Sequence, residues 1–309
     1  MLFNYHRIDQ DNAGDMLSSP VNYFEFDTPT LELEIGPIQE PLRFDGDVIL
    51  GGGGLLARTT FERRVRDLCE NSPHKLISWG IGHNAYTGAA GRHIRYRGLV
   101  KVGKRVKSRL LGWGIMRAPA AVTIDYGSIR DIMDRFAMHG IRDYGCGYDW
   151  VPCASCMHPV IDKYRGRTIQ HDAIVYDHVG RKRLLIDGLP RMGNASGDID
   201  EIMTFLSSGE TIITSTYHGA YWGLLLGRRV IVVPWSTKFM GFKHPVVLCH
   251  ELVDLPGCLQ KARAFPEALE ECRAATVAYA DRVANLLDIE VRRRPDIGRP
   301  GLSGHQQIV

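Results

Sequence analysis

Acidic residues are missing from a long part of the chain. Its 309 residues include 35 aspartates and glutamates, yet none lies between Asn71 and Ile124. The basic segment RHIRYRGLVKVGKRVKSR (92–109) falls inside that stretch. It is interpreted either as a solvated basic face or as a surface for the phosphates of a substrate or an anionic membrane, where each basic residue contributes about 1 kcal/mol. The net charge of only +3, without a recognisable binding motif, argues against a nucleic-acid partner.

Long apolar runs and a leader-like N-terminus are also missing. No run approaches the roughly 18 residues of a membrane span, and MLFNYHRIDQ lacks a basic segment followed by an apolar stretch and a cleavage site. We therefore expect a cytoplasmic protein without a secretory signal. Its basic segment would allow peripheral contact with the inner face of the membrane.

Cysteine is present in a pattern that excludes several chemistries. The seven cysteines are irregularly spaced, so we expect reduced thiols rather than a disulfide framework. Only Cys153 and Cys156 have C-x-x-C spacing, and a second ligand pair is lacking apart from Cys249–His250. We predict no metal site and interpret both thiols of the motif as buried structural groups.

Apolar runs alternate with helix-like stretches along the chain. Strand-like runs occur in both halves, and they cover residues 47–54, 74–82, 172–178, 182–188, 211–215 and 228–235. Helix-like stretches separate most of them, at 55–71, 199–209 and from Gly219 onward. This alternation predicts an α/β fold in which helices cover parallel sheets.

The same alternation predicts two Rossmann-like domains. We place the first at residues 1–165, on the acceptor side and including the basic segment, and the second at 166–290, on the donor side. The second ends in a long amphipathic helix at 266–289. Residues 291–309 are predicted to be a disordered tail.

Ligands of parallel α/β sheets bind outside the carboxyl ends of the strands, which directs attention to the loops there. His83 and His218 lie in two such loops, and with pKa values near neutrality both could carry protons. Arg142 and Lys238 could hold a phosphate or a carboxylate. The alternatives are structural histidines, and for Arg142 an ion pair with Asp143 or a role at a domain boundary.

The glycines at 51–54 suggest dinucleotide binding only superficially. The fingerprint requires a third glycine where this chain has Leu56 or Ala57, and no convincing carboxylate follows. We expect no bound cofactor. Gly52 and Gly53 instead offer backbone that a ligand can approach closely, with N–H groups suited to an anion.

The order of several short motifs resembles that of the polysaccharide pyruvyltransferase family. The motifs are DNAGD (11–15), VILGGGGLL (48–56), WGIG (79–82), IRD (141–143), VPCAS (151–155) and STYHG (215–219), followed by a strand that ends near Lys238. The resemblance implies two Rossmann-like domains in a glycosyltransferase-B-like arrangement, with the active site in the cleft between them.

The activity implied is transfer of the enolpyruvyl group of phosphoenolpyruvate, as co-substrate, to a sugar of a lipid-linked oligosaccharide during exopolysaccharide synthesis. On this basis Arg142 would bind the anionic groups, and His218 would carry a proton and contact phosphate together with Ser215. His83 would be the second acid or base, and Lys238 a further phosphate ligand. Asn12, Asp15, Gly52 and Gly53 would bind the acceptor or shape the loops.

One residue departs from the family pattern. Many members have an arginine two residues before the motif histidine, where this chain has Thr216. Two other functions therefore stay open. One is a nucleotide-sugar-dependent glycosyltransferase, although GAYWGLLLG (219–227) lacks the carboxylate expected to hold ribose. The other is a non-catalytic glycan-binding subunit of a polysaccharide-assembly complex.

Overall fold

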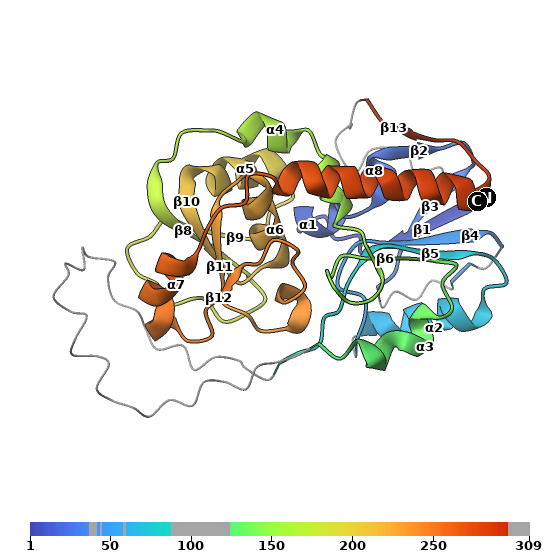
Figure 1. Cartoon of the computed structure of the whole chain (residues 1–309), viewed down its shortest axis with the longest axis horizontal. Helices are drawn as coiled ribbons and strands as arrows, with labels where there is room; N and C mark the ends of the chain where they lie inside the picture. The colour runs from blue at the N-terminus through green and yellow to red at the C-terminus, as the bar shows by residue number, and fades with distance from the viewer. Residues whose placement is uncertain (37–41, 44, 58–59, 88–123, 296–309) are drawn as a thin grey trace.

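The computed structural model describes residues 1–36, 42–43, 45–57, 60–87 and 124–295. The basic segment 92–109 lies outside the described residues. Within them the chain is α/β and contains two parallel sheets side by side, each with helices packed against it (Figure 1). The fold class predicted from the alternating runs is confirmed at this level. None of the described helices is long and apolar enough to cross a membrane.

The first sheet has six parallel strands in the order β3-β1-β4-β5-β6-β7. They are β1 (Leu2–His6), β3 (Thr30–Glu34), β4 (Asp47–Gly51), β5 (Leu76–Ile81), β6 (Met138–Ile141) and β7 (Asp149–Trp150). Every residue of β5 is buried, as expected for a parallel strand covered on both faces. The helices α2 (Thr60–Asn71) and α3 (Arg130–Met133) lie beside one face (Figure 1). The short α1 (Ala13–Met16) follows β1.

The second sheet has five parallel strands in the order β12-β11-β10-β8-β9. They are β8 (His171–Asp177), β9 (Arg191–Gly193), β10 (Gly209–Thr214), β11 (Arg229–Val232) and β12 (Val247–Leu248). Its helices are α4 (Val160–Tyr164), α5 (Ile199–Ser208), α6 (Tyr217–Leu225) and α7 (Leu255–Lys261).

The strand predicted at 182–188 is wrong, because the strand in this part of the chain is β9, which begins at Arg191. The Arg191 guanidinium donates hydrogen bonds of 2.9 Å to the carbonyls of Leu184 and Ile186 and ties this segment to β9.

The long C-terminal helix packs on both sheets. It is α8 (Ala268–Leu287), close to the predicted 266–289, and it crosses from one sheet to the other in Figure 1. Near its start it packs against α6. Further along, the Tyr279 hydroxyl donates to the carbonyl of Ser78 in β5 at 2.7 Å. One cluster of buried apolar side chains contains residues from both sheets, so the two sheets share a core. The predicted domain limits stay a prediction.

The start of the predicted disordered tail is ordered, which corrects that expectation. Val291–Arg293 form β13, which pairs antiparallel with β2 (Phe24–Phe26). The Arg294 N–H extends the pairing by donating to the Tyr23 carbonyl at 2.9 Å. Hydrogen bonding to β2 therefore holds these residues against the first sheet, and only 296–309 lie outside the described part.

Candidate functional site

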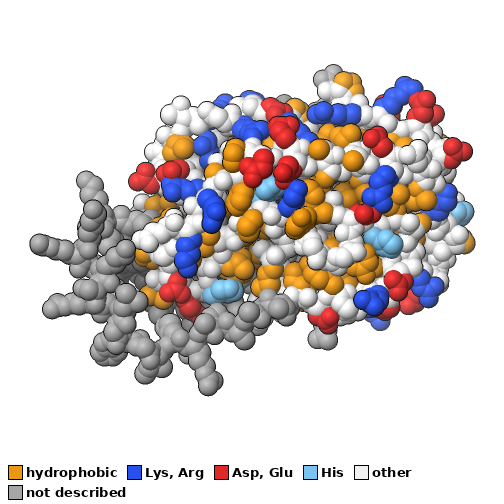
Figure 2. All heavy atoms as spheres, viewed as in Figure 1, with side chains coloured by type: hydrophobic (Ala, Val, Ile, Leu, Met, Phe, Trp, Pro, Cys, Tyr) orange, Lys and Arg blue, Asp and Glu red, His pale blue; other side chains and the backbone are white. Residues whose placement is uncertain are grey.

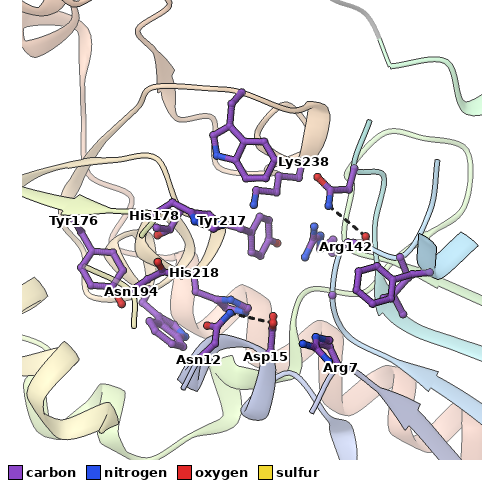
Figure 3. A pocket seen from close by; sticks show the side chains of 18 residues that line it. Arg7, Asn12, Asp15, Arg142, Tyr176, His178, Asn194, Tyr217, His218 and Lys238 are labelled. Carbon is purple, nitrogen blue, oxygen red and sulfur yellow. Dashed lines mark hydrogen bonds between the residues drawn. The ribbon is translucent and has the colours of Figure 1, made fainter. Parts of the chain in front are cut away.

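The carboxyl ends of both sheets face one cavity of about 220 Å³ (Figure 3). From the first sheet, the loops after β1, β4, β5 and β6 contribute Arg7, Gly53, Asn84 and Arg142. From the second, the loops after β8 to β11 contribute His178, Asn194, Thr216, Tyr217, His218, Trp235 and Lys238. Chain segments far apart in sequence thus meet at one place, the location that parallel sheets favour for ligands.

The structure brings together six of the predicted site residues and leaves three outside the cavity wall. Those that line the cavity are Asn12, Asp15, Gly53, Arg142, His218 and Lys238. His83, Ser215 and Gly52 do not line it. Their positions are explained below, because each has a structural task.

Arg142 is a buried cation with unused hydrogen-bond donors. It follows β6 directly, and only 4% of its surface is exposed. Its guanidinium carbon lies 3.7 Å from the centre of the Tyr217 ring, and neither Nε nor Nη2 has a hydrogen-bond partner among the described residues. A buried charge in this state is costly, and an anion in the cavity would compensate it. The alternative interpretation, an ion pair of Arg142 with Asp143, is not found among the described residues, where Asp143 Oδ2 accepts the backbone N–H of His83 at 2.7 Å.

Asp15 and Lys238 both line the cavity, and the charge of each acts on the pKa of the other. Burial raises the pKa of the Asp15 carboxyl to about 6, although Lys238 and Arg7 oppose this rise. Burial also lowers the pKa of the Lys238 amine to about 7, an effect increased by the nearby Arg142. Two groups of the cavity wall therefore titrate near neutrality, as acid–base chemistry requires.

Local structure explains where these two side chains lie. Asn12 caps α1 by accepting the N–H of Gly14, and its amide donates to Asp15 Oδ2 at 3.0 Å. Lys238 lies in the 3₁₀ turn η4 (Thr237–Phe239), with its amine 4.0 Å from the centre of the Trp235 ring.

His218 lies in the first turn of α6 and lines the cavity. The expectation that its pKa lies near neutrality is wrong. Burial lowers it to about 3, and the positive charges of Arg142 and Lys238 add to the effect. The imidazole is therefore neutral at physiological pH. It packs so closely on α1 that a side chain at Gly14 would lie 2.1 Å from Nδ1. This contact explains why a glycine stands in the DNAGD motif.

Thr216 forms the N-terminal cap of α6. Its hydroxyl accepts the N–H of Gly219 at 2.9 Å and also lies 3.1 Å from the Thr214 hydroxyl. An arginine here could not make these contacts. A guanidinium is nevertheless present next to this position, because that of Arg142 lies over the ring of the following residue, Tyr217.

His83 connects the two sheets instead of lining the cavity. Its Nδ1 lies 2.7 Å from the Thr237 hydroxyl, and its ring meets Tyr126 edge-on. Burial lowers its pKa. The expected role as a second acid or base is therefore not supported by its position.

Ser215 and Gly52 shape the loops of the site. Ser215 Oγ accepts the N–H of His178 at 3.0 Å, and the Ser215 carbonyl accepts the indole N–H of Trp235 at 2.8 Å. Gly52 has a φ of 67°, and a side chain there would collide with Ser18. Both residues hold neighbours in place, and neither lines the cavity.

The two cysteines of the C-x-x-C motif are buried, as predicted. Cys153 Sγ lies 3.5 Å from His218 Nε2, and Cys156 Sγ lies 3.4 Å from the Thr276 hydroxyl. Burial raises the pKa of both thiols, for Cys156 to about 11. The pair of Cys153 and His218 is thus neutral, which is the opposite of an activated thiolate nucleophile. The described residues contain no cluster of side chains suited to a metal ion.

Sequence reasoning missed several residues of the cavity wall. Arg7 directly follows β1, and His178 directly follows β8, so the rule that located His218 could have located both. The predicted strand 172–178 includes His178, which lies one residue beyond the end of β8. Burial lowers its pKa to about 4. The aromatic residues Tyr217 and Trp235 gave no comparable signal.

Comparison with known proteins gives no family for the chain. No protein-family model, curated protein or solved structure matches it. Its function is therefore argued from the cavity.

Proposed function

We propose that the protein transfers the enolpyruvyl group of phosphoenolpyruvate to a sugar hydroxyl of a lipid-linked glycan precursor and closes a pyruvate ketal. The observation that carries the proposal is Arg142, a buried guanidinium at the cavity wall whose Nε and Nη2 have no partner among the described residues. Arg7 and Lys238 add positive charge, against which the described part of the wall offers one carboxylate, that of Asp15. Such a site favours a small ligand with more than one anionic group.

The N-terminus of α6 adds to this preference. The helix begins at Tyr217, and Thr216 already caps the N–H of Gly219, which leaves the N–H groups of Tyr217 and His218 for a ligand. In the proposed complex the phosphate and the carboxylate of the donor contact these groups and Arg142.

Cavity size supports a small donor over a nucleotide sugar. Pockets for drug-sized ligands typically have volumes of about 300–1,000 Å³. The cavity here has about 220 Å³, which suits a three-carbon acid phosphate better than a base, a ribose and a sugar together. The residues of α6 also provide no carboxylate for a ribose.

Asp15 is the proposed proton carrier. Protonated, it donates its proton to C3 of phosphoenolpyruvate, which makes C2 electrophilic. The first sugar hydroxyl attacks C2 and returns a proton to the Asp15 carboxylate. Phosphate then leaves toward Arg142 and Lys238, and a second hydroxyl closes the ketal while its proton goes to the departing phosphate. The pKa of about 6 makes Asp15 better suited to this step than His218, which is neutral.

The two sheets are proposed to act as two Rossmann-like halves of a glycosyltransferase-B-like arrangement. The cavity between their carboxyl edges would be its active-site cleft. The basic segment 92–109, outside the described residues, is proposed to hold the protein at an anionic membrane near its acceptor.

Phosphate release tests the proposal. Purified protein is incubated with phosphoenolpyruvate and a panel of lipid-linked glycan acceptors, and released phosphate and the ketal product are measured by enzymatic assay and mass spectrometry. We expect phosphate release only with a suitable acceptor. Binding of a nucleotide sugar without binding of phosphoenolpyruvate would contradict the proposal and favour a glycosyltransferase. Binding of glycan alone would favour a non-catalytic glycan-binding subunit.

A further inference from the structure

A chain of hydrogen bonds runs behind the imidazole of His218. Cys153 Sγ lies 3.5 Å from His218 Nε2 and 3.3 Å from Ser155 Oγ. Ser155 Oγ in turn accepts the indole N–H of Trp222 at 3.1 Å. Trp222, Ser155 and Cys153 each have at most 1% of their surface exposed. The contacts among these three side chains are therefore shielded from water.

The fold holds this chain rigidly. His218 and Trp222 are four residues apart on α6, so their rings share one face of the helix, with centres 5.0 Å apart. The Tyr221 hydroxyl donates to the carbonyl of Cys153 at 2.9 Å. This bond fixes Cys153, directly before the 3₁₀ turn η3 (Ala154–Met157), against α6.

Only one direction of donation satisfies the hydrogens of Trp222, Ser155 and Cys153 together. An indole N–H can only donate, so Ser155 Oγ must accept from Trp222. The Ser155 hydroxyl hydrogen then goes to Cys153 Sγ, and the Cys153 thiol hydrogen goes to His218 Nε2. In the reverse direction the thiol would donate to Ser155, whose own hydrogen would be buried without an acceptor among the described residues, a costly state.

We propose that Cys153 is a positioning residue that fixes His218 in the tautomer carrying its hydrogen on Nδ1. Nδ1 packs beside Gly14 and has no hydrogen-bond partner among the described residues, and the imidazole lines the cavity, so a ligand there is left as the acceptor of its N–H. A neutral imidazole can then donate to an anionic oxygen without being protonated. The identity of that oxygen, on phosphoenolpyruvate, rests on the proposed function, whereas the tautomer does not.

Long-range ¹H–¹⁵N correlation spectra of the full chain test the tautomer without any substrate. The His218 signals are assigned by their loss in His218→Asn. In the wild type we expect a pyrrole-type Nδ1 and a pyridine-type Nε2. In Cys153→Ala, which lacks the donor, we expect the hydrogen to move to Nε2. Cys153→Ser, which restores a donor, should return it to Nδ1. An Nε2–H tautomer in the wild type, or no change in Cys153→Ala, would overturn the proposal.

Cys156→Ala is the matched control, because Cys156 is equally buried but contacts Thr276 instead of His218. It should leave the His218 tautomer unchanged. Inorganic phosphate serves as the second probe. Cys153→Ala should weaken phosphate binding about tenfold, the scale of one charge-assisted hydrogen bond, and Cys156→Ala should not. Equal weakening in both variants would indicate a merely structural role and contradict the proposal.

The two proposals fail separately. An Nδ1–H tautomer in a protein that does not turn over phosphoenolpyruvate would refute the proposed function and leave the inference intact. Turnover with an Nε2–H tautomer would refute the inference alone.

Discussion

The carboxyl edges of the two sheets contribute different chemistry to the same cavity. The first sheet contributes two guanidinium groups and a carboxyl, those of Arg7, Arg142 and Asp15, in the segments that follow its strands. The second contributes rings, an amine and a helix N-terminus, including Tyr217 beneath the Arg142 guanidinium. Figure 2 shows apolar and charged side chains close together on one face of the molecule, so mixed surfaces are not special to the cavity. Burial shifts the pKa values of both Asp15 and Lys238. Arg142 of the first sheet adds to the shift of Lys238, whereas Lys238 of the second sheet opposes the shift of Asp15, so the groups of each edge tune those of the other.

Replacing Asp15 should have the largest effect on this division of labour. Asp15→Asn removes the proton carrier of the first sheet, so kcat should fall about 10²–10⁴-fold, the usual contribution of general acid–base catalysis. Binding of phosphoenolpyruvate should be kept or improved, because a negative charge is removed. Turnover and calorimetric titration check the two parts. Asp11→Asn, on the same loop but exposed, is the control and should behave as wild type.

The pH dependence of thermal stability tests the environment of Asp15, and the same melting curves show whether Asp15→Asn is folded. The folded-state pKa of Asp15 is raised to about 6, so the carboxyl favours folding below its unfolded pKa of 3.8 and loses this contribution as pH rises through about 6. The melting temperature of Asp15→Asn relative to wild type should therefore be higher at pH 8 than at pH 4. The reverse trend would contradict the assigned environment of Asp15.

Replacing Arg142 or Arg191 distinguishes a cation that binds the ligand from one that stabilises the fold. Arg142→Met should weaken binding of phosphoenolpyruvate about 10–150-fold, because a hydrogen bond to a charged group contributes about 1.5–3 kcal/mol. Arg191 bonds Asp177 and two carbonyls, so Arg191→Met should lower the free energy of unfolding by up to about 3–5 kcal/mol. Titration calorimetry and denaturant unfolding measure the two effects. Strong binding by Arg142→Met would refute its role.

The pH dependence should show both cavity groups. The proposed reaction needs Asp15 and Lys238 protonated, so kcat/KM should fall as pH rises through about 6 and again through about 7. The phosphate of the donor also titrates near pH 6, so the wild-type profile is compared with that of Asp15→Asn. The variant should lose the part of the decline near 6 that Asp15 causes, and the decline due to Lys238 should move to lower pH, because the Asp15 charge that raises its pKa is gone. Identical profiles would show that Asp15 does not carry the proton.

His83 should give the smallest effect on turnover. His83→Gln removes a ring that contacts Thr237 at 2.7 Å but does not line the cavity. Stability should fall by about 1–3 kcal/mol, while kcat of the folded variant stays close to wild type. His218→Gln is the comparison and should weaken phosphate binding. A large loss of kcat in folded His83→Gln would restore it as a catalytic residue.

Sequence patterns located the edge of the site but could not sort the residues on it. The alternation of runs predicted parallel sheets, and the strand-end rule led to both His83 and His218. Only through-space packing distinguishes them, since Thr237 of the opposite sheet engages His83. The predicted strand 172–178 extends one residue beyond β8, so His178 is assigned to the strand and not to the loop that lines the cavity. The pKa shifts arise from burial and from charges distant in sequence, which local patterns do not contain.

The most direct test of the account is a crystal structure of the protein with phosphoenolpyruvate. We expect the donor in the cavity, with an anionic oxygen within hydrogen-bond distance of the Arg142 guanidinium and with its C3 atom facing Asp15. Crystals saturated with phosphoenolpyruvate that show an empty cavity, or a donor bound away from Arg142, would contradict it.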